Sequence, residues 1–98
     1  MSSPDFVSHL ISSEDALRAR VTGSGIELNF NKSPEDRLKT AAWVTAERRG
    51  RCAELIVWSS GEVEFAAGTV GSDVRQEHHE ISSFAELDSL LAELLSAV

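Results

Sequence analysis

The chain has 98 residues, of which 42% are hydrophobic and 26% are charged, and these values indicate one ordinary globular domain. Its formal net charge of −7 argues against a nucleic-acid partner, because binding to phosphates needs a basic surface. The N-terminus has no basic stretch with a long apolar run, and the longest uncharged apolar run is residues 55–58, so we expect neither a signal peptide nor a membrane partner.

The acidic charge is concentrated in the second half of the chain. Residues 1–52 hold seven acidic and eight basic residues, whereas residues 53–98 hold nine acidic residues and one basic residue, Arg75. Opposite charge steers association, so this asymmetry favours a protein partner with a basic surface. An acidic surface can equally serve solubility alone, and that alternative stays open.

The first element of the chain is predicted to be helical. Over residues 4–20 the apolar residues recur every three to four positions and fall on one face, formed by Phe6, Val7, Leu10, Ile11, Leu17 and Val21. Serines followed by acidic residues at 12–15 are a helix-start pattern, so the helix could break there and begin again. Gly23 and Gly25 are predicted to end it.

Residues 26–30 are predicted to form a strand, because Ile26, Leu28 and Phe30 alternate with polar residues and share one face. Residues 31–36 are expected to form a loop or a single helical turn. Residues 34–48 allow two interpretations. A helix could begin at Pro34 and end at Gly50, but β-forming residues at 40–45 favour a strand, with Trp43 and Thr45 on one face and Ala42, Val44 and Ala46 on the other.

Residues 48–51 are predicted to form a solvated, arginine-rich hairpin tip. Residues 52–58 are nearly continuously apolar, so we expect a central strand with both faces at least partly covered, and with Cys52 as a small buried side chain. Cys52 is the only cysteine, which favours a reducing compartment, and we expect the protein to be cytoplasmic. Trp43 and Trp58 would lie on neighbouring strands, and we favour core packing over an interface role for them.

A second hairpin is predicted to follow a tight turn at residues 59–61. Residues 62–67 alternate, so Val63, Phe65 and Ala67 face one way and the side chains between them face the other. After a turn at 68–73, residues 74–81 are predicted to form a polar strand near an edge of the sheet.

The last helix carries the clearest signals of the chain. Ser83 and Glu86 form a capping box at its start. Its broad apolar stripe needs an apolar sheet face to cover, and consists of Phe84, Leu87, Leu90, Leu91, Leu94, Leu95 and Val98. We therefore predict an α+β fold, in which N- and C-terminal helices pack on one face of an antiparallel four- to five-stranded meander sheet. The other face should be more polar and open.

Residues 77–80 (EHHE) form the richest cluster of ionisable side chains. On a strand, His78 and Glu80 point one way while Glu77 and His79 point the other, so the two histidines cannot easily share a metal ion. The cluster also lacks the spacing of the helical HExxH motif. We expect no metal site here, but polar residues that face solvent or a partner, with histidines that could respond to pH.

Motifs for catalysis and for cofactor binding are not recognisable. Cys52 has no adjacent histidine or helix N-terminus to activate its thiol. Residues 59–61 lack the spacing of a nucleophile elbow, and the glycines at 23 and 25 lack the lysine of a phosphate-binding loop. We therefore expect no enzymatic activity, no catalytic residues and no cofactor.

Residues 58–65 (WSSGEVEF), followed by 77–80 (EHHE) and an acid-capped C-terminal helix, resemble the TriTu family of bacterial immunity proteins. The resemblance covers roughly residues 51–95. It implies a protein that is carried beside a secreted antibacterial toxin, an ADP-ribosyltransferase that modifies elongation factor Tu. It further implies that the immunity protein binds this toxin and blocks its active site.

Three classes of function remain, and a toxin-neutralising immunity protein is favoured over a small adaptor in a larger complex. An enzyme or small-ligand binder is the third class, and would need a closed pocket in which His78 or His79 meets a carboxylate. The oligomeric state stays open. The candidate partner-binding residues are Trp58, Glu62, Glu64, Glu77, His78, His79 and Glu80.

Overall fold

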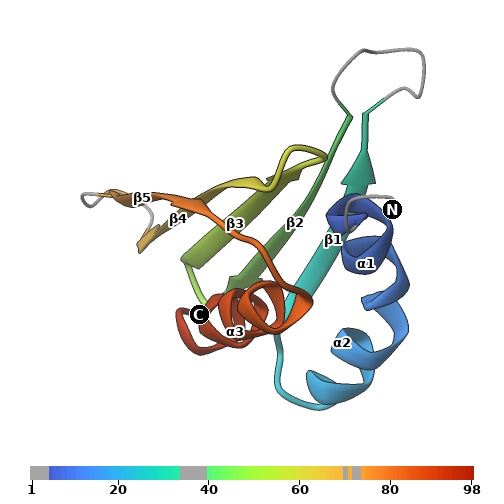
Figure 1. The fold of residues 1–98 in the computed structure, drawn as a ribbon. Helices are drawn as coiled ribbons and strands as arrows, with labels where there is room; N and C mark the ends of the chain where they lie inside the picture. Colours follow the sequence, from blue (N-terminus) through green and yellow to red (C-terminus); the bar gives the residue numbers. More distant parts are fainter. Residues whose placement is uncertain (1–4, 34–39, 70, 72–73) are drawn as a thin grey trace.

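A computed structural model describes residues 5–33, 40–69, 71 and 74–98. Five antiparallel strands form one sheet in the order β1-β2-β3-β4-β5, so every strand pairs with its neighbour in sequence (Figure 1). The fold is therefore the expected α+β meander with terminal helices. The elements in chain order are α1 (Phe6–Ser12), α2 (Glu14–Arg20), β1 (Glu27–Lys32), β2 (Ala41–Arg48), β3 (Arg51–Trp58), β4 (Glu62–Thr69), β5 (Val74–Glu80) and α3 (Phe84–Ser96).

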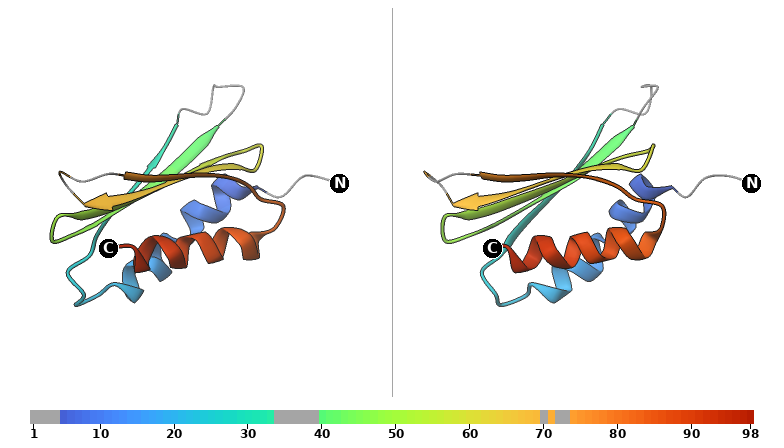
Figure 2. Two further views of the ribbon diagram at one scale, coloured as in Figure 1. Left: turned by 90° about the vertical axis from the view of Figure 1, so that its left-hand side faces the viewer. Right: turned by 60° about the vertical axis from the view of Figure 1, so that its left-hand side comes forward.

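The three helices of the described residues all lie on the same side of the sheet (Figure 2). Helix α1 packs on β2 and β3, and α3 packs on β3 and on α1. Between the two layers lie side chains without solvent exposure, such as Leu10 and Leu87 from the helices and Leu55 and Val63 from the strands. Burial of each such side chain stabilises the fold by about 1.5–3 kcal/mol. Within the described residues, no helix is long and apolar enough to cross a membrane.

Within the described residues, the helices cover the sheet on one face only. Along β3 the buried residues alternate with less buried ones, so Ala53, Leu55 and Val57 face the helices while Cys52 and Ile56 face away. The helices cover only one face of β3, although Glu54, Ile56 and Trp58 on the other face are partly buried, in line with the predicted partial cover. The prediction that Cys52 is buried is wrong, because its side chain is exposed. Apolar residues on both sides of a strand do not by themselves show that both sides are covered.

The helical start of the chain is broken at Ser13, as its sequence allows. The Ser13 backbone N–H donates to the carbonyls of His9 and Leu10, and its hydroxyl donates to the carbonyl of His9 at 2.8 Å. These bonds close α1 before α2 begins. Asp5 caps the start of α1, because its carboxylate accepts the backbone N–H of Ser8 at 2.9 Å. Residue 4, where the predicted helix begins, lies outside the described residues.

Strand, not helix, is the correct interpretation of residues 41–48, while residues 34–39 lie outside the described residues. Strands β2 and β3 join through Arg49 and Gly50, whose φ angles of 50° and 80° belong to a two-residue turn that suits a hairpin. The prediction that all the arginines of this tip are solvated is wrong for Arg48. This side chain is half-buried, and its Nη2 donates to the carbonyl oxygen of Val98 at 3.1 Å.

The last helix starts at a modified capping box. The hydroxyl of Ser83 accepts the backbone N–H of Glu86 at 3.2 Å, as predicted. The carboxylate of Glu86 accepts the N–H of Ser82 at 3.0 Å, in place of the N–H of Ser83 that the motif predicts. Phe84 does not enter the core, because it is 41% exposed and stacks on the His9 ring with 4.2 Å between ring centroids.

Candidate functional site

The side of the sheet that faces away from the helices, which we call the open face, lies opposite the core cluster. Pairing is in register across all five strands, so side chains of matching parity lie together on this side. The open face comprises Glu27, Asn29, Asn31, Ala41, Trp43, Thr45, Glu47, Cys52, Glu54, Ile56, Trp58, Glu62, Glu64, Ala66, Gly68, Val74, Gln76, His78 and Glu80.

Charge on the described strands is divided between the two sides of the sheet. The open face holds no lysine or arginine from any described strand position, although it holds six glutamates: Glu27, Glu47, Glu54, Glu62, Glu64 and Glu80. The basic residues of the strands project to the helix side instead: Lys32, Arg48, Arg51 and Arg75. The open face therefore presents a negative potential that attracts cationic surfaces.

On β2 and β3, the end of the open face near the β3–β4 turn is apolar. Trp43 pairs with Ile56 across β2 and β3, and Trp58 pairs with Ala41, which places the two tryptophans diagonally across the strand pair. Trp43, Ile56 and Trp58 are each only partly buried. Core packing was the favoured prediction for the tryptophans and is wrong, because the helices cover the opposite face. Tryptophan on an uncovered face is typical of protein interfaces.

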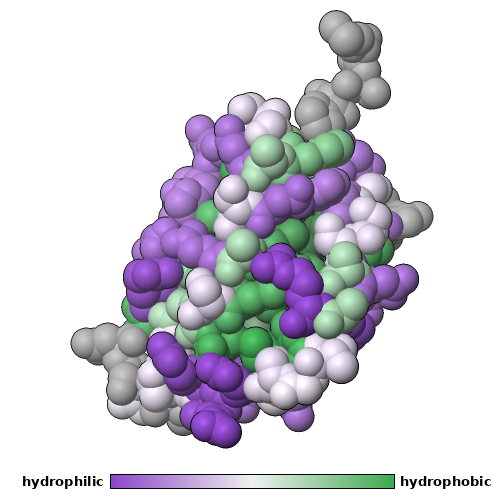
Figure 3. All heavy atoms as spheres, turned by 90° about the horizontal axis from the view of Figure 1, so that it is seen from below, coloured by the Kyte–Doolittle hydropathy of each residue, from purple (hydrophilic) through white to green (hydrophobic). Residues whose placement is uncertain are grey.

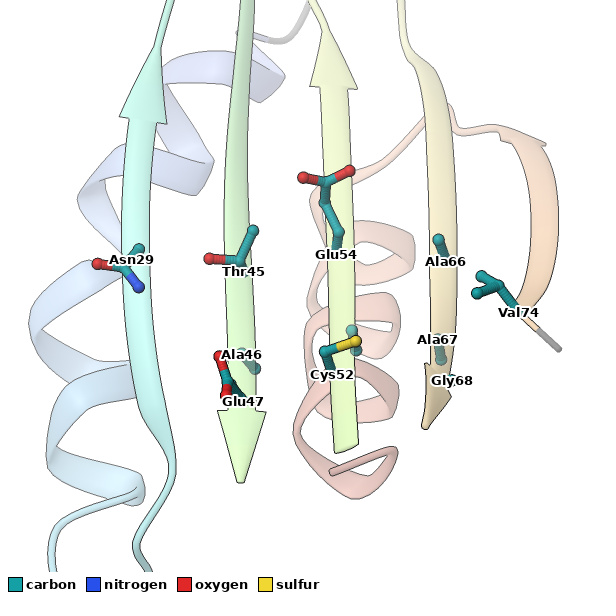
Figure 4. Close-up of a pocket in the computed structure, with 11 residues that line it drawn as sticks. Asn29, Thr45, Ala46, Glu47, Cys52, Glu54, Ala66, Ala67, Gly68 and Val74 are labelled. Atoms are coloured by element: carbon teal, nitrogen blue, oxygen red, sulfur yellow. The ribbon is translucent and has the colours of Figure 1, made fainter. Parts of the chain in front are cut away.

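The other end of the open face is hollowed. A depression of about 270 Å³ lies over β3, and its lining includes the small residues Thr45, Cys52 and Ala66 together with the acidic residues Glu47 and Glu54. Figure 4 shows Cys52 and Glu54 on β3 between Thr45 on β2 and Ala66 on β4. The hollow exists because small side chains at its centre are flanked by longer ones at its rim.

His78 forms the one histidine–carboxylate pair on the described open face. Its Nδ1 lies 2.6 Å from Oε1 of Glu64, its partner in the strand register. The hydrogen bond to Glu64 raises the pKa of His78 above its usual value of 6.5, and the charges of Glu62 and Glu80 act in the same direction. The side chains of both His78 and Glu64 are exposed to solvent.

The sequence-predicted site residues divide between the two sides of the sheet. Trp58, Glu62, Glu64, His78 and Glu80 share the open face. The remaining two are on the helix side, where Nε2 of His79 lies 3.0 Å from the carboxylate of Glu77. The alternation predicted for residues 77–80 is therefore correct. Within the described part of the chain, no group of three or more histidine, cysteine or acidic side chains could hold a metal ion.

Sequence patterns alone did not identify several residues of the open face. Glu47 and Glu54 at the hollow, and Trp43 and Ile56 at the apolar end, were not among the candidates. The alternation of side chains along β2 and β3 identifies these residues once the two strands are paired in register. Sequence motifs draw attention to neighbours along one strand, whereas this surface is assembled across five.

Comparison with known families gives one match over most of the chain. Residues 11–97 match the family described as "Immunity protein TriTu", and this range includes every strand, α2 and α3. No curated protein and no solved structure gave a match.

Proposed function

The chain belongs to the TriTu family of immunity proteins, and from this premise we propose that it binds and neutralises a cognate antibacterial toxin. We propose further that the toxin is an ADP-ribosyltransferase and that the bound protein blocks its active site. In this proposal the protein acts in the cytoplasm of the producing cell, by binding and without catalysis.

The observation that best supports the proposal is the one-sided core. An inhibitor that covers an active site needs an exposed surface whose shape persists, and the open face lies on a hydrogen-bonded five-stranded sheet backed by the helices. Preformed backbone of this kind loses little conformational freedom on binding, which favours tight association. The exposed thiol of Cys52 fits a reducing compartment, where it stays unpaired.

The charge of the open face supports the class of toxin. An enzyme that uses NAD must hold the two phosphates of the dinucleotide, and it does so with cationic side chains or backbone N–H groups. A cleft built for an anionic substrate therefore suits the glutamates of the open face, such as Glu54 and Glu64. Occupying that cleft would exclude NAD and stop transfer of ADP-ribose.

Co-expression tests the immunity function directly. The gene immediately upstream of this one is expressed in a bacterial host with and without this chain, and growth is followed. We expect the upstream product to arrest growth alone and to be harmless with this chain. Absence of toxicity, or toxicity without rescue, would contradict the immunity function and favour the adaptor.

A second assay tests the proposed mechanism. Purified toxin, labelled NAD and elongation factor Tu are mixed with increasing amounts of this protein, and the label on the elongation factor is measured. We expect labelling to fall to background near one equivalent of the protein over toxin. Rescue of growth without loss of labelling would retain the immunity function but exclude blockage of an ADP-ribosyltransferase active site.

A further inference from the structure

We propose that the toxin docks on the open face, that it presents a basic surface there, and that one of its lysine or arginine side chains enters the hollow over β3. This inference rests on the proposed function, and it names the contacting surface and the chemistry of the partner. Three features of the described residues carry it: the pairing of like charges, the size of the face, and the lining of the hollow.

Like charges lie directly opposite each other at two places on the open face. Glu27 pairs with Glu47 across β1 and β2, and Glu62 pairs with Glu80 across β4 and β5. Directly opposite like charges destabilise a sheet, and a surface that served only solubility would intersperse both signs. At Glu27 and Glu47 the arrangement therefore opposes folding stability in the free protein. A cationic partner reverses this at Glu27 and Glu47, because its charges neutralise that pair on binding.

The size of the open face matches a single protein interface. Its strands are six to eight residues long. Five strands spaced about 4.8 Å apart, with a rise of about 3.3 Å per residue, give a surface of roughly 600 Å² before side-chain relief is counted. A stable complex buries about 800 Å² on each partner. The partner must therefore use most of the face, including both the apolar end around Trp58 and the hollow.

The hollow suits a long basic side chain. Ala66, Val74 and Thr45 offer short or apolar surface for the methylene stem of a lysine or arginine, whose charged head can then reach Glu47 or Glu54. Neither of these carboxylates is paired with another described residue by a hydrogen bond or an ion pair. Both are therefore available to a partner.

The helix side is the competing docking surface. Figure 3 shows the molecule from below, where hydrophobic side chains reach the surface among hydrophilic ones. The strand positions on this side carry Arg48, Arg51 and Arg75, whereas α3 carries the exposed acidic residues Glu86, Asp88 and Glu93. Charges of both signs therefore meet on the helix side, and it attracts a basic partner less than the open face does. Variants on α3 therefore make matched controls for variants on the open face.

Two matched pairs of substitutions test the inference. Ala66→Arg fills the hollow, and Ala92→Arg places the same side chain on the exposed surface of α3. Glu54→Lys reverses a charge at the hollow, and Glu93→Lys reverses one on α3. Binding to the purified toxin is measured by surface plasmon resonance at low and high salt, and thermal unfolding of each variant confirms that it is folded.

We expect Ala66→Arg to weaken binding about 30-fold or more, as loss of a central hot spot does. Glu54→Lys should weaken binding about 10-fold and slow association, with a smaller effect at high salt. Both controls on α3 should stay within about twofold of the unmodified protein, since they lie outside the docking surface. This pattern would establish the open face as the docking surface of a basic partner.

The outcomes separate this inference from the proposed function. If the unmodified protein does not bind the toxin, the proposed function fails. If it binds and rescues growth but the two open-face variants bind equally well, the docking surface is wrong while the function stands. If Ala66→Arg weakens binding but Glu54→Lys and salt have no effect, the basic character of the partner is overturned. A loss confined to the α3 variants would place the toxin on the helix side.

Discussion

Replacement of Gly61 should destabilise the protein more than replacement of any glycine in an open turn. Gly61 is buried in the turn between β3 and β4, with a φ of 94°. Its carbonyl accepts the backbone N–H of Ile81 at 2.9 Å, which ties this turn to the end of β5. A Cβ added to Gly61 would lie 2.7 Å from the carbonyl oxygen of Ile81 and 3.4 Å from a ring carbon of Phe6. The perturbation is therefore Gly61→Ala.

The magnitude follows from comparison with Gly23, whose φ is 78° and whose added Cβ would meet nothing within 4 Å. The left-handed conformation costs a residue with a Cβ about 1–2 kcal/mol, and both alanine variants share that cost. Contact with a fixed backbone oxygen adds about 1–3 kcal/mol for Gly61→Ala alone. We therefore expect Gly61→Ala to lower the free energy of unfolding by about 2–5 kcal/mol and Gly23→Ala by about 1–2 kcal/mol.

Urea denaturation followed by circular dichroism measures both values, and thermal unfolding should show about 4–8 °C for each kcal/mol lost. A domain of this size has roughly 5–15 kcal/mol of stability in total, so the larger loss is easily resolved. If Gly61→Ala and Gly23→Ala lower the free energy of unfolding equally, the close approach of Gly61 to Ile81 has no energetic weight and the reasoning is refuted.

Three further predictions concern ionisation, reactivity and capping. In a proton NMR titration, His78 should show a pKa above 6.5, and this pKa should fall in the Glu64→Gln variant. The stability that the pair contributes is therefore present below pH about 6.5 and is lost as the pH rises through the raised pKa of His78. An unchanged pKa in Glu64→Gln would exclude the pairing. The exposed thiol of Cys52 should react with a maleimide in the native protein, and a reaction that needs urea would place it in the core. Ser83→Ala should cost about 1 kcal/mol in urea denaturation through loss of the α3 cap, whereas a value near zero would show that the cap contributes nothing.

Periodicity was a reliable guide where one side of an element is apolar. The alternation of Val63 and Phe65 with glutamates predicted β4 and its buried side correctly, and the stripe along the last helix predicted α3. The strand at 41–48 was the harder decision, since Pro34 and Gly50 offered helix boundaries. Strand β2 exists because its alternating Ala42, Val44 and Ala46 side chains complete the same buried face.

The open face could not be predicted in the same way. Ile56 and Trp58 are apolar, so local pattern placed them in a core, and only the position of all the helices on one side shows that they are uncovered. Glu54 pairs with Thr45 on one side and Ala66 on the other, relations that depend on strand register and not on any motif. The cluster at residues 77–80 instead indicated Glu77 and His79 as partner-binding candidates, although both project to the helix side.

The one-sided core also affects how such a protein can change over generations. The side chains that hold the fold together, such as Leu55 and Phe65, lie between the sheet and the helices, whereas Thr45, Glu54 and Ala66 lie on the other side. Substitutions at exposed positions usually alter the free energy of unfolding by less than about 0.5 kcal/mol. A lineage can therefore exchange open-face residues as an opposing protein diverges, without compensating changes in the core. Under the proposed docking on the open face, specificity and foldability are inherited on separate sets of residues.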